Sequence, residues 1–163
     1  MTTGATEWFP EKRCTVLLVD DISDSREMYA FFLRASGYAV HEAADGGDAV
    51  DIALEFRPDV IVMDLSLPSM DGWTAIATLS ASPETARIPV VVLSAHTFPA
   101  DEQRAREAGA AAFLAKPCPP DELARHVRRV SKTCDQAFAV IPSEIPAAVA
   151  ASTAPQTGPT PAP

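Results

Sequence analysis

Short apolar runs of this chain end in residues that could do chemistry. Asp20 and Asp21 follow the first such run, and Asp64 follows another. Ser94 and Lys116 come directly after two further runs. If these runs are parallel strands, their carboxyl ends meet along one crevice at the edge of the sheet, where ligands bind. The sequence therefore predicts one site that holds three carboxylates, a hydroxyl group and an ammonium group.

The charges in this predicted site do not balance by themselves. Two like charges about 4 Å apart repel by roughly 4 kcal/mol at an effective dielectric constant of about 20. Lys116 cannot neutralise three carboxylates, so either one carboxylate is protonated or a cation is bound. An all-oxygen ligand set without nearby His or Cys favours a hard ion. Mg²⁺ is the natural choice, because it keeps several waters and needs only one or two carboxylates.

The same groups could take up a phosphoryl group. Mg²⁺ and Lys116 would offset its charge, Ser94 could donate a hydrogen bond to one of its oxygens, and a carboxylate could attack phosphorus. Asp64 is central among the predicted strands and is the expected nucleophile. Taken singly, each residue has a plainer explanation as a helix cap, a turn residue or a solvated charge. Their joint placement at the correct strand ends favours a site for phosphoryl transfer.

The elements that would position this site alternate along the chain. Runs rich in Val, Ile and Leu predict five buried strands, at residues 14–19, 38–41, 60–63, 88–93 and 111–115. Segments with helical spacing lie between and after them, at residues 25–36, 47–56, 73–80, 100–108 and 119–132. Right-handed crossovers place such helices on both faces of a mainly parallel sheet. The predicted fold class is therefore α/β, a doubly wound parallel sheet of five strands.

Capping residues support these boundaries. Asp24, Asp45 and Asp121 could accept hydrogen bonds from the free N–H groups where helices begin. Gly37 and Gly109 suit the left-handed position that follows a helix end.

Length and composition bound the organisation of the chain. Its 163 residues fit one domain with flanking segments, and 47% hydrophobic with 21% charged residues is typical of globular proteins. We expect a leader at residues 1–12, a domain at 13–132 and a disordered Pro/Ala-rich tail at 133–163. The net charge of −9 disfavours binding to nucleic acid. Without a signal-like apolar start or a run of about 18 apolar residues, we expect no membrane insertion and a soluble protein. The three cysteines are odd in number and lack metal-ligand spacing, so the expected location is the reducing cytoplasm.

Four segments carry a resemblance to a known family. They are residues 16–21 (VLLVDD), 60–72 (VIVMDLSLPSMDG), 89–95 (PVVVLSA) and 113–117 (FLAKP). In this order and spacing they resemble the receiver domain of bacterial response regulators, over about residues 13–132. The resemblance implies a flavodoxin-like (βα)5 fold with strand order 2-1-3-4-5. It also implies a phosphoacceptor signalling protein that assists its own phosphorylation and dephosphorylation and is not an enzyme.

The resemblance also implies a role for each acidic residue. Asp64 would be the phosphoacceptor. Asp21 and Asp64 would bind Mg²⁺ directly, together with the backbone carbonyl of Ser66. Asp20 would lie near the ion or act through a water molecule.

Carried over in the same way, the remaining motif residues act on the phosphoryl group or respond to it. Lys116 would pair with the phosphoryl group, and the Lys116–Pro117 bond would be cis. Ser94 would hydrogen-bond a phosphoryl oxygen and so act as a switch residue. Phe113 stands at the aromatic switch position, where many relatives have Tyr, so a switch here would work by packing without a hydroxyl group.

Partners follow from the same resemblance. The phosphodonor would be a sensor histidine kinase or a histidine phosphotransfer protein, expected to dock near Ser25, Arg26 and Tyr29 and the loop at 117–120. Only the Pro/Ala-rich tail follows the domain, so we expect no DNA-binding output domain. The output would pass through residues 96–130 to a protein target, or to a second copy in a phosphorylation-dependent homodimer.

Three alternative functions stay open at this point. A phosphatase with an aspartyl-phosphate intermediate would want a second Asp two residues after Asp64, where this chain has Ser66. A flavodoxin-like redox module would need a hydroxyl- and glycine-rich loop after the first strand, where this chain has Asp20 and Asp21. A receiver-like interaction module that works without phosphorylation is disfavoured, since no chemical group is missing.

Overall fold

The computed structural model describes residues 13–96 and 98–131. Most of the predicted domain lies within these ranges. The expected leader at 1–12 and the expected tail at 133–163 fall outside them.

Five strands form one parallel sheet in the order β2-β1-β3-β4-β5. The strands are β1 (Thr15–Val19), β2 (Ala39–Ala43), β3 (Val60–Met63), β4 (Val90–Ser94) and β5 (Ala112–Ala115). This confirms the predicted fold class and strand order. Because all strands run the same way, their carboxyl ends lie along one edge of the sheet, and β1 and β3 are neighbours at its centre.

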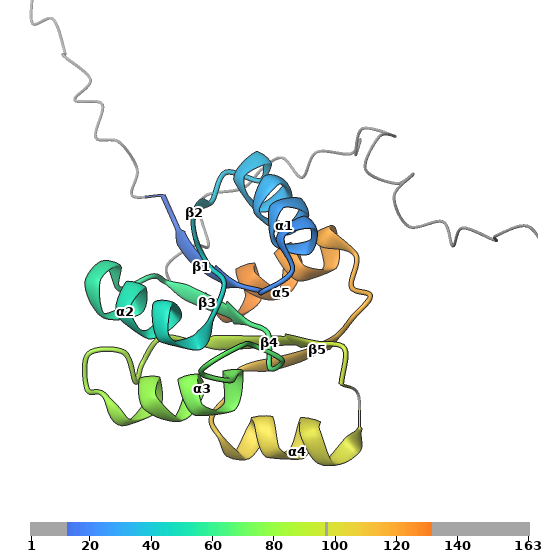
Figure 1. The fold of residues 1–163 in the computed structure, drawn as a ribbon. Helices are drawn as coiled ribbons and strands as arrows, with labels where there is room; N and C mark the ends of the chain where they lie inside the picture. Colours follow the sequence, from blue (N-terminus) through green and yellow to red (C-terminus); the bar gives the residue numbers. More distant parts are fainter. Residues whose placement is uncertain (1–12, 97, 132–163) are drawn as a thin grey trace, which may run out of the picture.

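Five helices connect the strands and cover both faces of the sheet (Figure 1). They are α1 (Ser23–Ala35), α2 (Gly46–Phe56), α3 (Gly72–Ala81), α4 (Pro99–Glu107) and α5 (Pro120–Val130). Helices α1 and α5 lie on one face, and α2, α3 and α4 lie on the other (Figure 1). The result is a three-layer sandwich with the sheet in the middle.

Alternating strand residues feed two separate cores. Val16 and Leu18 of β1 pack on the α1–α5 side, while Leu17 and Val19 pack on the side of α2 to α4. All four are at most 1% exposed. A fully buried Leu or Val stabilises a fold by about 1.5–3 kcal/mol, so strands with two buried faces contribute twice along their length. This is why the sequence shows continuous apolar runs here without an alternating pattern.

The predicted helix caps are partly wrong. Asp45 does cap α2, accepting a hydrogen bond from Asp48 N at 2.9 Å. Asp24 and Asp121 do not cap; they lie within the first turns of α1 and α5, which begin after Ile22 and Pro119 without a side-chain cap. Negative charges in a first turn still stabilise a helix through its dipole, so composition alone does not separate the two positions.

Predicted helix ends and strand boundaries were closer to the structure. Gly37 and Gly109 follow the ends of α1 and α4 with φ angles of 89° and 94°, as expected. Strand β2 is displaced by one residue at its start and two at its end relative to the prediction. Its residues are mostly half-buried at the sheet edge and include His41 and Glu42. The strand therefore lacks the continuous apolar run by which the central strands were predicted.

One buried hydroxyl group, that of Ser36, is expected to lower the stability of the fold. Ser36 is 5% exposed, and its Oγ has no hydrogen-bond partner among the described residues. Removing an unsatisfied buried polar group should stabilise the fold, so we expect Ser36→Ala to raise the free energy of unfolding by about 1 kcal/mol. Urea denaturation measures this change. Loss of stability in Ser36→Ala would show that the hydroxyl group is in fact satisfied.

Thr85→Val is the matched control. The Thr85 hydroxyl group is also buried but donates to Leu79 O at 2.7 Å. Its removal leaves that carbonyl without this donor and should lower stability by about 1–2 kcal/mol.

Candidate functional site

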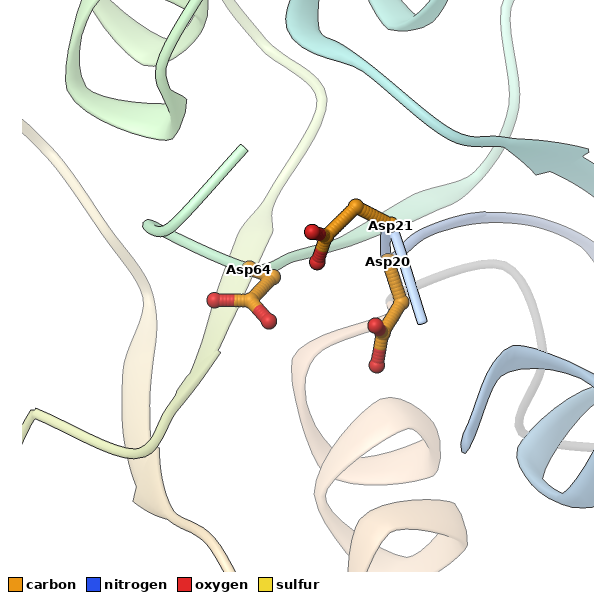
Figure 2. A group of neighbouring side chains, drawn as sticks. All are labelled: Asp20, Asp21 and Asp64. Carbon is orange, nitrogen blue, oxygen red and sulfur yellow. The ribbon is translucent and has the colours of Figure 1, made fainter. Parts of the chain in front are cut away.

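Three carboxylates meet at the carboxyl ends of β1 and β3. Asp20 and Asp21 follow β1 and Asp64 follows β3, and one oxygen of each lies within 4.8 Å of the others. Figure 2 shows the three side chains converging from the two strand ends. Asp20 and Asp64 are buried, at 1% and 5% exposure, whereas Asp21 is exposed. The structure thus brings together the three acidic residues that the sequence singled out.

Lys116 joins this cluster from the end of β5. Its ammonium group contacts Asp20 Oδ2 at 2.7 Å and Asp64 Oδ2 at 2.8 Å. The Lys116–Pro117 peptide bond is cis, as the resemblance implied. Burial by itself lowers the pKa of Lys116, but the hydrogen bonds and charges of the two carboxylates outweigh it, so the pKa is raised above 10.5. Lys116 is therefore a cation that links two strands of the acidic site.

The carboxylate of Asp20 has a full set of donors. Its Oδ1 accepts from Ile22 N at 2.9 Å, and its Oδ2 accepts from Ser25 Oγ at 2.7 Å as well as from Lys116. The Asp64 carboxylate accepts fewer hydrogen bonds: Oδ1 accepts from Ser66 N at 2.9 Å, and Oδ2 accepts from the Lys116 ammonium group. Asp20 therefore serves mainly to orient Lys116, and Asp21 and Asp64 are the more open carboxylates.

A tight turn after β3 carries Asp64 and Ser66. Gly72 N donates to Leu65 O at 3.1 Å, which brings the start of α3 back against the strand end. A Cβ atom at Gly72 would lie 2.2 Å from the backbone oxygen of Asp64. Only glycine fits there, so the residue that closes the turn also fixes the backbone beneath Asp64.

Ser94 ends β4 and is fully buried. Its Oγ accepts from His96 N at 3.1 Å, and within residues 13–96 and 98–131 no acceptor for its hydroxyl proton is found. Ser94 O also accepts from Lys116 N at 2.8 Å, which ties the ends of β4 and β5 together. The hydroxyl group is therefore held in place with its proton available.

The donor set fits a hard divalent cation. Three carboxylates carry three negative charges, and Lys116 offsets one of them. All candidate ligand atoms are oxygens, which suits Mg²⁺ and disfavours Zn²⁺ or copper. The residues that would hold such an ion are Asp21 and Asp64, with Asp20 behind them.

Known proteins share both the motifs and the fold. The family model described as "Response regulator receiver domain" matches residues 16–128. The chain belongs to the response regulator receiver family. Receiver domains take phosphoryl groups from histidine kinases, and a receiver is a phosphoacceptor signalling protein rather than a catalytic enzyme.

Two curated relatives differ in how much of them this receiver covers. The polar-differentiation response regulator DivK of Brucella anthropi is 34% identical over 103 residues, covering 63% of this chain and 84% of DivK. A gliding motility regulatory protein of Myxococcus xanthus is 39% identical over 116 residues, covering 71% of this chain. This chain spans only 15% of that larger protein.

One solved structure of a similar domain contains a magnesium ion. The receiver domain of a Pseudomonas aeruginosa sensor histidine kinase aligns with a TM-score of 0.67 at 35% identity, covering 72% of this chain and 96% of that one. That domain was solved with a magnesium ion coordinated in its active site cleft.

Phe113 of the receiver lies at the α4–β5–α5 surface. It is half-buried and packs against the core that contains Ala105 of α4. It also lines a hollow of about 230 Å³ between α4, β5 and α5, together with Arg106, His126 and Arg129. Burial, followed by the charge of Arg129, lowers the pKa of His126. An aromatic ring and several cationic or polar groups thus share one recess on this surface.

The expected phosphodonor contacts on α1 point inward. Ser25 donates to Asp20, and Arg26 donates to the backbone oxygen of Asp20 at 2.7 Å. Tyr29 is buried, and its hydroxyl group donates to Cys118 O at 2.9 Å. These residues therefore support the site from within the fold, and Ile22, 57% exposed, is the open apolar side chain beside it. Donor docking at this edge stays a prediction.

Two neighbours of the site have structural roles. Cys118 is a free, buried thiol, and burial chiefly raises its pKa to about 11, so it stays protonated and unreactive near neutral pH. Trp73 of α3 is half-buried and lies under the guanidinium group of Arg104 from α4, 4.3 Å from the ring centroid. Both side chains therefore contribute to packing beside the site.

Sequence reasoning missed the residues that orient Asp20. The bonds from Ile22 N to Asp20 and from Ser66 N to Asp64 each span two residues, the pattern of an Asx turn. An Asp at a strand end before a turn is a signal for that motif. No comparable local pattern predicts that Ser25 and Arg26 contact Asp20.

Lys116→Met should destabilise the receiver by about 3 kcal/mol, because it leaves two buried carboxylates without their shared cation. The Lys116 ion pairs stabilise the fold fully below pH 10.5 and lose that effect only as pH rises through the raised pKa. Guanidinium denaturation at pH 7 measures the loss, and adding Asp20→Asn should recover part of it.

Arg125→Met is the control for this comparison. It breaks the exposed Arg125–Asp121 pair on α5 and should change stability by no more than about 0.5 kcal/mol. Equal losses for Lys116→Met and Arg125→Met would contradict a special role for Lys116.

Proposed function

We propose that this receiver accepts a phosphoryl group on Asp64, from a sensor histidine kinase or a histidine phosphotransfer protein, with the help of Mg²⁺. The observation that carries the proposal is the contact of one ammonium group with both Asp20 and Asp64, beside a third carboxylate. This arrangement offers a nucleophile, a fixed cation and an oxygen ligand set in one place. The magnesium-bound relative from Pseudomonas aeruginosa supports the choice of ion.

In the proposed step an Asp64 oxygen forms a bond to phosphorus while the bond from phosphorus to the donor imidazole nitrogen breaks. The electrons of the broken bond stay with the imidazole, which takes up a proton, and Asp64 becomes an acyl phosphate. The carboxylate is held for this attack by Ser66 N and by the glycine turn beneath it. Such positioning supplies a large part of the rate of phosphoryl transfer.

Two side chains would then stabilise the phosphoryl group. Lys116 can exchange its contact with Asp64 for one with a phosphoryl oxygen while Asp20 continues to orient it. Ser94 can donate its hydroxyl proton to another oxygen, giving a charge-assisted hydrogen bond. Mg²⁺, held by Asp21, Asp64 and the Ser66 carbonyl with Asp20 nearby, would offset the remaining negative charge.

The alternatives are less well supported. A phosphatase of the aspartyl-phosphate type would need a second acid two residues after Asp64, and that position is Ser66. A receiver-like module that works without phosphorylation would have no use for a nucleophile. In this chain Asp64 contacts Lys116, and the buried Ser94 ends the neighbouring strand, which supports a role for Asp64 in phosphorylation. Direct labelling separates these alternatives.

Asp64→Asn should abolish acid-labile labelling by acetyl phosphate in the presence of Mg²⁺, because the nucleophilic oxygen is lost while the side-chain shape is kept. Intact-mass measurement detects the added phosphoryl group. Asp71→Asn is the matched control: Asp71 is an exposed acid that caps α3, and its loss should leave labelling unchanged. Full labelling of Asp64→Asn would rule out Asp64 as the phosphoacceptor.

For the output we propose the surface formed by residues 96–130. Arg106, Arg125, His126 and Arg129 line its recesses together with Glu102 and Glu122, and Arg125 and Arg129 are exposed on α5. This chemistry suits an acidic partner surface, or the acidic residues of a second copy in a phosphorylation-dependent homodimer. The link to Asp64 would run through Ser94, which moves toward the phosphoryl group, to Phe113, which then turns further into the protein.

Phe113→Ala tests this link. Its phosphorylation by acetyl phosphate should be close to that of the wild type, while phosphorylation-dependent amide shifts across residues 96–130 should largely disappear. Phe113 is already more than half buried, so burying the rest of its ring is worth about 1 kcal/mol, which shifts a two-state equilibrium roughly fivefold. Phe31→Ala, at an exposed Phe on α1, is the control. Wild-type shifts confined to residues beside Asp64 would show that this switch is absent.

Location and other binding modes follow from family and charge. Receiver domains are typically cytoplasmic, and we propose the same for this one. The net charge of −9 argues against direct nucleic-acid binding. In the described part of the chain, none of the helices has the length and apolar character of a membrane span.

A further inference from the structure

We propose that Arg26, paired with Glu42, is a positioning residue that holds the backbone at Asp20 and Asp21 and thereby sets the affinity of the site for Mg²⁺. This inference rests on the proposed function. Arg26 lies in the first turns of α1, and Glu42 lies on the edge strand β2. Neither was expected to act on the ion.

The contacts of Arg26 are specific and partly buried. Its NH1 donates to the backbone oxygen of Asp20 at 2.7 Å, and its Nε lies 3.3 Å from Glu42 Oε2. The side chains of Arg26 and Glu42 are 19% and 27% exposed. A planar guanidinium group can meet a carbonyl and a carboxylate at the same time, and a lysine cannot reproduce that geometry. Arg26 is therefore fitted to hold one peptide group against β2.

Both backbone groups of Asp20 lead to the same strand. Asp20 N donates to Ala43 O of β2 at 3.1 Å, and Asp20 O reaches β2 through Arg26 and Glu42. The bond through Arg26 holds the peptide that joins Asp20 to Asp21. This peptide is the last one before the exposed Asp21 side chain.

Asp21 depends on that peptide for its position. Unlike Asp20 and Asp64, its carboxylate has no hydrogen bond or ion pair within residues 13–96 and 98–131. Its place within 4.8 Å of the other two acids is therefore set by the backbone that carries it. Losing the Arg26 contact would loosen one ligand of the site without touching any carboxylate.

Charge and position predict opposite effects, which makes the proposal testable. Arg26 is a cation close to the proposed cation site, so electrostatics alone predicts that Arg26→Ala binds Mg²⁺ more tightly. Positioning predicts weaker binding, by about tenfold, as is typical when a group that orients a ligand is removed. Arg26→Lys keeps the charge, so any weakening in that variant cannot come from charge.

Arg34 supplies the matched control. It contacts the same Glu42, with its NH2 2.7 Å from Oε1, but it contacts Val40 O rather than Asp20. Arg34→Ala should therefore leave Mg²⁺ affinity within about twofold of the wild type. If Arg26 and Glu42 act together on Asp20, the double variant Arg26→Ala/Glu42→Ala should bind Mg²⁺ no more weakly than Arg26→Ala alone.

The experiment measures Mg²⁺ dissociation constants of the full chain by titration calorimetry, and then the Mg²⁺ dependence of labelling by acetyl phosphate. We expect Arg26→Ala to bind Mg²⁺ about tenfold more weakly, and Arg26→Lys by a smaller factor. Both should need more Mg²⁺ for half-maximal labelling, with a rate at saturating Mg²⁺ close to that of the wild type. If Arg26→Ala does not fold, Arg26→Lys carries the test, because it keeps the charge and changes only the geometry of the contact.

Three results would overturn the inference. Unchanged or tighter Mg²⁺ binding by Arg26→Ala and Arg26→Lys would exclude positioning, as would an equal loss in Arg34→Ala. A lower rate at saturating Mg²⁺ with unchanged affinity would also exclude it. Failure of the wild type itself to bind Mg²⁺ or to label would instead overturn the proposed function, and this inference with it.

Discussion

The contact of the Lys116 ammonium group with Asp20 and Asp64 is the interaction on which the arrangement of this site depends. The three residues come from the ends of β5, β1 and β3, so their contacts require these strands to end at the same level. Two buried carboxylates would repel each other if the lysine were displaced. The fold therefore builds a region of concentrated negative charge and stabilises it with one positive group from a distant part of the chain.

Apolar burial in the rest of the domain offsets the unfavourable repulsion between these charges. Each central strand has two buried faces, and the two cores lie on opposite sides of the sheet. Their apolar burial is spread over the whole sheet, whereas the unfavourable charges are confined to one edge. Tyr29 adds a specific tie at that edge, because its hydroxyl group joins α1 to the loop that follows Lys116. Function and stability are thus separated in space within one small domain.

The fold and the acidic cluster could be predicted because they depend on patterns that a sequence displays. Buried parallel strands read as apolar runs, and Asp20, Asp64 and Lys116 stand directly after them. Helix starts were harder: Asp45 caps α2 while Asp24 does not cap α1, since the same residue type is favoured both at the cap and in the first turn.

Other parts of the site could not be predicted because they rest on pairs distant in sequence. Arg26 looked like a surface residue of α1, and only the packing of β2 beside β1 reveals that it meets Glu42. The bond from Tyr29 to Cys118 spans 89 residues and leaves no local signal.

The unequal exposure of the three acids has a consequence for the speed of ion exchange. Asp20 and Asp64 are buried, but Asp21 faces solvent. If Mg²⁺ binds as proposed, an arriving ion would meet the exposed Asp21 first and would have to shed waters to reach the buried Asp64. Because Mg²⁺ gives up its waters reluctantly, that dehydration would slow the loading and emptying of the site.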